Sequence, residues 1–218
     1  MKRDRALDAL HEKAPNYDVS ATEMFTPENG WEIDDYCEPL PPERPGPPVS
    51  GGSWKIAQRL MRDYEFADPD IVRALYRPDD PLENRDMLLE LRIFGLTVRV
   101  GVRVAAVRDE TSEIEGRPVR IWGWSYRTLQ GHLEMGQMDY AVWKWIDSGE
   151  VEFRIHRFSR PASIPNPIVR LGFRLFGRRK QVEFAQRACE RMAALTNAEL
   201  RGEEPPVART ADELAARA

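Results

Sequence analysis

Apolar and polar residues alternate between positions 96 and 107, and this is the strongest secondary-structure signal in the chain. Arg99 and Arg103 fall on one face of the run. Because successive side chains of a strand point to opposite sides, the pattern predicts a half-buried β-strand. Antiparallel strands with one apolar face need a cover on that face, so the chain is expected to fold in layers. The residues of the apolar face are Val98, Val100, Val102 and Val104.

Other segments extend this pattern into an α+β fold. Further strands are predicted over residues 87–94, 119–128, 138–146 and 150–159, with Gly95 in a tight connection, a solvent loop over residues 109–117 and a hairpin turn at residues 147–149. Helices are predicted over residues 53–64 with Ser53 as N-cap, over residues 71–76, and over residues 168–197 with a bend or break at Gly177. The order predicts a curved antiparallel β-sheet wrapped on a long C-terminal helix.

Prolines crowd the segment from residue 39 to residue 48. Because proline fixes φ and lacks a backbone donor, neither a helix nor a central strand is expected there. We therefore predict a Pro-rich, flexible leader over residues 1–52, a single domain over residues 53–197 and a charged tail over residues 198–218. The alternative is that the leader docks on the domain through Phe25, Trp31 and Tyr36.

The overall composition limits the kinds of partner and compartment that are expected for the chain. A net charge of −4 and a pI near 5.6 argue against general affinity for nucleic acid, which needs a basic surface. Cys37 and Cys189 lie far apart, which argues against a disulfide framework and favours a reducing compartment. The first residues are charged throughout, and no apolar run approaches the ~20 residues of a membrane span, so a cytoplasmic protein is predicted. No metal site and no cofactor are predicted.

Large aromatic side chains recur along the predicted strand at 119–128. Trp122, Trp124 and Tyr126 share one face, and Tyr140 of the next strand lies near them. Such residues join a rigid apolar surface to a polar tip, as the walls of ligand pockets do. Packing of an ordinary core is the other interpretation of the same residues.

His132 and Glu134 are two positions apart, so on a strand their side chains would share a face. A carboxylate beside an imidazole tunes its pKa and orients its tautomer, which acid–base catalysis requires. The structural alternative is that His132 satisfies backbone groups of a turn while Glu134 pairs with an arginine. A third metal ligand is not evident from the spacing.

Four segments stand out in fixed order: Trp122-Gly123-Trp124, Tyr126-Arg127-Thr128-Leu129-Gln130-Gly131-His132, Glu134-Met135-Gly136 and Phe158-Ser159-Arg160-Pro161-Ala162. Together they resemble the signature of a domain-of-unknown-function family, DUF1990, also called uncharacterised protein family UPF0548. The resemblance covers about residues 53–192 and implies a fold similar to the Bet v 1 and START lipid-binding proteins. In this helix-grip fold a curved sheet wraps a long helix and leaves a cavity between them. The family implies no settled activity, and this chain has Leu133 and Gln137 where the family usually has a proline and a second acid.

The first hypothesis for the function is a non-enzymatic protein that binds a small apolar or amphipathic molecule between sheet and terminal helix. An alternative is an enzyme of cyclase, hydrolase or isomerase type with His132 and Glu134 as its acid–base pair. A second alternative is a protein-interaction module that uses residues 15–52. The basic run Arg174 to Lys180 predicts a solvated helix face, or else weak contact with an anionic membrane surface. The predicted ligand-binding residues are Trp122, Trp124, Tyr126, Thr128, His132, Glu134, Tyr140 and Arg160.

Overall fold

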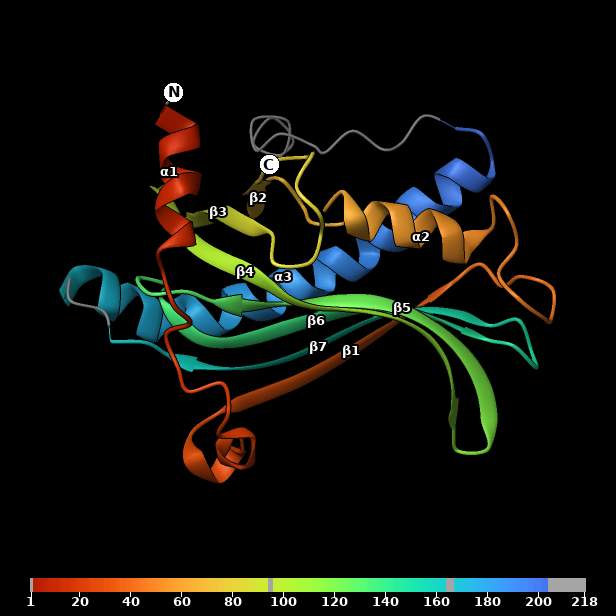
Figure 1. Cartoon of the computed structure of the whole chain (residues 1–218), viewed down its shortest axis with the longest axis horizontal. Coiled ribbons are helices and arrows are strands. Elements are labelled where there is room, and N and C mark those ends of the chain that lie inside the picture. The colour runs from red at the N-terminus through yellow and green to blue at the C-terminus, as the bar shows by residue number, and fades with distance from the viewer. Residues whose placement is uncertain (1, 94–95, 164–166, 204–218) are drawn as a thin grey trace, which may run out of the picture.

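The computed structural model describes residues 2–93, 96–163 and 167–203 (Figure 1). Its strands form one antiparallel sheet in the order β1-β7-β6-β5-β4-β3-β2. The predicted fold class is confirmed, because this curved sheet carries a long C-terminal helix. The elements in chain order are α1 (Lys2–His11), 3-10 turns at Thr22–Met24 and Pro27–Asn29, β1 (Glu32–Leu40), α2 (Ser53–Arg62), β2 (Val72–Leu75), β3 (Asp86–Ile93), β4 (Leu96–Ile114), β5 (Arg117–Thr128), β6 (Glu134–Trp145), β7 (Val151–Pro161) and α3 (Pro167–Leu200).

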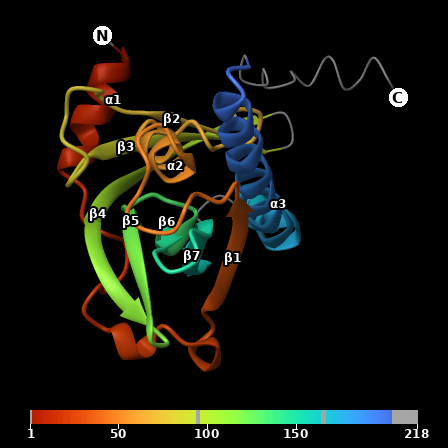
Figure 2. The same cartoon turned by 90° about the vertical axis from the view of Figure 1, so that its right-hand side faces the viewer.

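Helices α2 and α3 lie on the same side of the sheet, as Figures 1 and 2 show. We call the face that they cover the inner face. Of the valines of β4 predicted to be apolar, those at 100, 102 and 104 lie in its core and Val98 is partly buried against it. Trp122 and Trp124 of β5 and Tyr140 of β6 belong to the same core. Helix α2 is amphipathic and buries one side in the same core, with each large apolar side chain contributing ~2 kcal/mol when fully buried. The buried residues of α2 are Ser53, Trp54, Ile56, Ala57, Leu60 and Met61.

The opposite, outer face of the sheet is crossed by residues 15–31. The ring of Phe25 stacks on Phe158 of β7 with centroids 4.6 Å apart, and Trp31 packs on the edge of the same ring at 5.7 Å. Trp31 is buried, and Tyr17 completes the group by edge contacts to all three rings. We call Tyr17, Phe25, Trp31 and Phe158 the leader cluster.

Residues 32–40 of the expected flexible leader instead form the edge strand β1, which pairs with β7 along its whole length. The expectation of flexibility is wrong for this segment, and the docked alternative is the one observed. The strand is not apparent in the sequence because the inward positions of β1 carry acids such as Glu32 and Asp34. The segment therefore lacks the alternating apolar pattern of a half-buried strand. Those acids pair with Arg157 of β7 and Arg178 of α3. Pro39 fits because β1 lies at an edge of the sheet.

Several local expectations also differ from the structure. Residues 72–75 form a strand on β3 rather than a helix, because pairing at the sheet edge outweighs their helical spacing. The predicted loop at 109–117 is the end of a long β4–β5 hairpin, whose turn residues Glu115 and Gly116 both have positive φ, as tight hairpin turns require. Gly52, not Ser53, is the N-cap of α2.

The remaining expectations concern the ends of elements. The hairpin at residues 147–149 is confirmed between β6 and β7. Helix α3 runs through Gly177 without interruption and ends at Leu200. The connection at Gly95, and residues 204–218 of the predicted tail, lie outside the described residues.

Candidate functional site

Three phenol groups converge in the core of the inner face. The hydroxyl of Tyr140 donates to the sulfur of Met138 at 2.8 Å, and the hydroxyl of Tyr126 lies 3.6 Å from the same sulfur. The hydroxyl of Tyr64, just after α2, lies 3.5 Å from that of Tyr140. Burial raises the pKa of all three phenols, so they remain neutral donors and acceptors. The inner face is therefore aromatic but not wholly apolar.

The two predicted tryptophans lie in this core. Trp124 packs on Tyr140 with ring centroids 5.1 Å apart, and Trp122 lies under the guanidinium of Arg62 at 5.6 Å. Both rings are buried. The indole Nε1 of Trp124 is shielded from solvent and has no hydrogen-bond partner among the described residues. Buried polar atoms are nearly always paired, so this donor is an exception.

Glu134 begins β6, on the same side of the strand as Met138 and Tyr140. Its Oε1 is shielded from solvent and, within the described chain, has no hydrogen-bond partner. Burial raises the pKa of this carboxyl to about 7, and Arg157 opposes that shift only in part. Glu134 and Met138 stay partly exposed where Tyr140 is buried. The inner face is thus more open at the start of β6 than at its middle.

His132 lies in the turn before β6, not on the strand. Its Nδ1 accepts a hydrogen bond from the backbone N–H of Glu134 at 3.0 Å, so the ring proton lies on Nε2. Burial lowers the pKa of His132 to about 4, which keeps the imidazole neutral. The expectation that the imidazole and the carboxylate lie side by side on one face of a strand is therefore wrong. The alternative, in which His132 satisfies a backbone group of the turn, describes it correctly.

A cavity of about 590 Å³ lies where residues 15–18 of the leader meet the turn at 130–133. The leader is held there by the backbone bond from the N–H of Asn16 to the carbonyl of Thr128 at 3.2 Å. The hydroxyl of Thr128 donates to Asn16 Oδ1 at 2.7 Å and accepts from the N–H of Gly136 at 2.9 Å. Thr128 thus joins the leader to the turn at residues 130–133, which we call the signature turn, and His132 lines the cavity.

Arg160, the last predicted site residue, lies with the leader. Its guanidinium stacks over the ring of Trp31 at 4.8 Å. The predicted set therefore divides into an inner-face group and a leader group, which meet at the hydrogen bond between His132 and the backbone of Glu134. The inner-face group is Trp122, Trp124, Tyr126, Glu134 and Tyr140; the leader group is Thr128, His132 and Arg160.

Sequence reasoning did not single out Arg157 or the position of Tyr64. Arg157 occupies an inward position of β7 in line with Phe153 and Ile155, and its side chain is 2% exposed. An arginine in the apolar period of a strand was the available signal, since a buried cation needs a partner. Tyr64 has a φ of 60°, an uncommon conformation for an aromatic residue, and this could not be read from the sequence.

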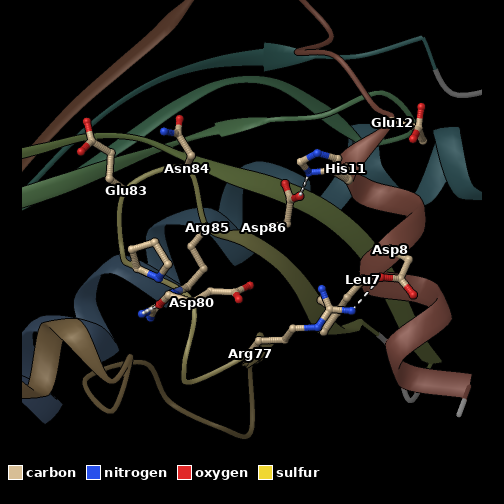
Figure 3. Close-up of a pocket in the computed structure, with 11 residues that line it drawn as sticks. Leu7, Asp8, His11, Glu12, Arg77, Asp80, Glu83, Asn84, Arg85 and Asp86 are labelled. Atoms are coloured by element: carbon tan, nitrogen blue, oxygen red, sulfur yellow. Dashed lines mark hydrogen bonds and ion pairs between the residues drawn. The ribbon is translucent and has the colours of Figure 1, made fainter.

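A second cavity of about 570 Å³ opens between α1 and the β2–β3 connection (Figure 3). Its charged walls are partly paired: Arg77 contacts Asp8 at 2.7 Å, and His11 lies 3.5 Å from Asp86. Among the described residues, no group of three or more histidines, cysteines, aspartates or glutamates could hold a metal ion. None of the sequence motifs maps to this cavity.

Two residues of the basic run on α3 form ion pairs. Arg178 pairs with Asp34 and Lys180 pairs with Glu183 at 2.8 Å, whereas the side chain of Arg174 lies outside the described part. Contact with a membrane surface stays a prediction. No helix in the described ranges is both long and apolar enough to cross a membrane.

Several solved structures are similar to this chain at low sequence identity. Ara h 8.0201 is 8% identical, with a TM-score of 0.47, over 78% of this chain and 99% of that chain. A START superfamily protein from Mycobacterium smegmatis is 14% identical, with a TM-score of 0.39, over 74% and 96%. Human STARD10 is 10% identical, with a TM-score of 0.35, over 89% and 88%.

Comparison of the sequence itself gives a family. No curated protein matches the chain. The profile of DUF1990, a domain of unknown function, matches residues 16–190, a range that includes the leader cluster, β1 and the signature turn. The match starts well before residue 53, in agreement with a leader that is built into the fold. The chain belongs to the DUF1990 family.

Proposed function

We propose that this protein binds a small apolar or amphipathic molecule between the inner face of the sheet and α3. The observation that carries the proposal is the pair of shielded polar atoms, Trp124 Nε1 and Glu134 Oε1, which have no partner among the described residues. Leaving such a group unpaired costs ~1–3 kcal/mol. A ligand with an apolar body and a polar group at Glu134 would offset that cost for the carboxylate. The phenols around Met138 would supply further polar contacts.

Acid–base catalysis by His132 and Glu134 has less support. The imidazole contacts the amide of Glu134 rather than its carboxylate, and it lines the leader cavity. A proton relay between the two side chains needs them within hydrogen-bond reach of one another or of a shared substrate. We therefore keep ligand binding as the function proposed for the site.

Two measurements test this function. Native mass spectrometry of freshly purified protein should show added mass that is released on denaturation. After extraction with solvent, the refolded protein should bind Nile red, a neutral apolar dye, with saturable fluorescence. Trp124→Phe keeps an aromatic ring in the core but removes the N–H, so we expect several-fold weaker dye binding.

Trp143→Phe is the matched control. Trp143 lies on the outer face, where Arg154 stacks on its ring at 4.0 Å, so this change should leave dye binding unaltered. Equal dye binding by wild type and both variants, with no co-purified molecule, would refute the proposed site.

A further inference from the structure

The buried cations of the inner face already have partners. Nε of Arg157 donates to Asp34 at 2.6 Å, and its Nη2 lies 3.2 Å from Glu32. Arg178 of α3 reaches the same two carboxylates, with Asp34 at 2.5 Å and Glu32 at 3.4 Å. Two arginines and two acids thus form one balanced cluster. At the other end of β6, the buried Lys144 contacts Glu43 at 2.6 Å.

Glu134 is not part of this cluster of paired charges. The charged groups that act on it come from three elements: Arg157 on β7, Glu32 on β1 and Arg178 on α3. Both arginines are held by Asp34 and Glu32, so they lower the pKa of Glu134 only in part, while Glu32 raises it. From β5, Tyr126 faces the same carboxyl. Within the described chain no cation forms an ion pair with Glu134.

We propose that the ligand is an amphipathic amine, with its ammonium group on the Glu134 carboxylate and its apolar body on the aromatic inner face. This inference rests on the proposed function. An ammonium group supplies the missing cation and donates to the unpartnered Oε1. The ring of Tyr126, which lies on the same face and interacts electrostatically with this carboxyl, also favours a cation over an anion.

A ligand with an anionic group in place of the ammonium fits this site poorly. A ligand carboxylate would meet Glu134 while the nearby arginines are already paired with Asp34 and Glu32. Like charges held close together in a partly buried site repel, which disfavours binding. A neutral hydroxyl could bond to Glu134 but would gain no ion pair. The order of affinity should therefore be amine, then alcohol, then carboxylate.

Three probes with the same apolar chain separate these cases: dodecylamine, dodecan-1-ol and dodecanoate. The two charged probes are kept below their micelle concentrations and the alcohol below its solubility limit. Displacement of Nile red from delipidated protein at about pH 8 gives their affinities, and native mass spectrometry gives their stoichiometry. Wild type should bind the amine about tenfold more tightly than the alcohol. A tenfold ratio of affinities corresponds to ~1.4 kcal/mol, which we expect from one ion pair. Glu134→Gln should weaken binding of the amine about tenfold and so abolish that preference.

Glu113→Gln is the control, because Glu113 is exposed near the end of β4 and its loss changes the net charge equally. This variant should keep the amine preference. Persistence of the preference in Glu134→Gln, or dodecanoate binding as tightly as the amine, would overturn the inference. If the alcohol binds but the amine is not preferred, the ligand class is wrong while the proposed function stands. If no probe displaces the dye, the proposed function fails as well.

Discussion

The imidazole Nδ1 of His132 accepts a hydrogen bond from the backbone N–H of Glu134 at 3.0 Å. This contact joins the signature turn to the first residue of β6. It also fixes the tautomer of His132 and leaves the carboxyl of Glu134 free to take part in other contacts. Two residues that look like a catalytic pair in the sequence therefore have separate roles, one in the turn and one on the inner face.

Replacement of His132 should test that role. His132→Leu leaves the amide of Glu134 without an acceptor and should cost ~1–2 kcal/mol of unfolding free energy. His132→Asn places an oxygen near the position of Nδ1 and should cost less. Urea unfolding at neutral pH measures both. A leucine variant as stable as the asparagine variant would contradict the assigned contact.

The same histidine should contribute to acid sensitivity. Its pKa in the folded protein is about 4, below the ordinary 6.5, so the unfolded state takes up its proton first as the pH falls. The stability due to His132 is present above about 6.5 and is lost as the pH drops toward 4. His132→Asn should flatten this part of the stability profile, measured by urea unfolding at successive pH values. An unchanged slope in that range would count against a buried, neutral imidazole.

Glu134 should have the opposite pH dependence. Its pKa is raised from 4.5 to about 7, so the unfolded state loses its proton first as the pH rises. Native stability falls between these values, and the penalty is complete above about 7. In ligand-free protein, Glu134→Gln should match wild type at about pH 4 and exceed its Tm by several degrees at about pH 8. A Tm difference that is independent of pH would show that the carboxyl is not buried as described, and Glu113→Gln controls for net charge.

The buried pair of Lys144 and Glu43 should anchor the proline-rich segment. Nζ of Lys144 donates to Glu43 at 2.6 Å and to the carbonyl of Pro47 at 2.9 Å, and Glu43 accepts from the N–H of Trp54 at 2.9 Å. Lys144→Met leaves a buried carboxylate unpaired and should cost ~3 kcal/mol or more. Adding Glu43→Gln should recover part of that loss, since the uncompensated charge is then gone. Denaturant unfolding of the two singles and the double variant gives the coupling, and strict additivity would contradict the pairing.

Removal of the leader should destabilise the domain rather than spare it. A chain lacking residues 1–50 loses β1, and with it Asp34 and Glu32, which balance the buried Arg157. An uncompensated buried charge alone costs ~3–5 kcal/mol, so Tm should fall by ~10 °C or more. Asp34→Asn in the full chain should reproduce part of the effect. Unaltered melting of the deleted chain would instead favour an independent interaction segment.

The local pattern of the sequence determined much of the sheet. The alternation over residues 96–107 and the aromatic face of Trp122, Trp124 and Tyr126 are properties of neighbouring residues. The aromatic face appears as predicted, and the alternation holds up to Val104, where the register of β4 shifts. Turn chemistry at residues 147–149 likewise specified the β6–β7 hairpin. These features depend on side-chain alternation and on local backbone preferences, which a single sequence displays.

Only the tertiary structure decided which segments join that sheet and where the site residues point. Strand β1 has acids at its inward positions, so it is stable only beside Arg157 and Arg178, which are more than a hundred residues away in the chain. His132 and Glu134 diverge because the strand begins at Glu134 and the turn before it is held by the leader at Thr128. In both cases the deciding energy comes from long-range charge pairing and hydrogen bonding, which leave no periodic pattern in the sequence.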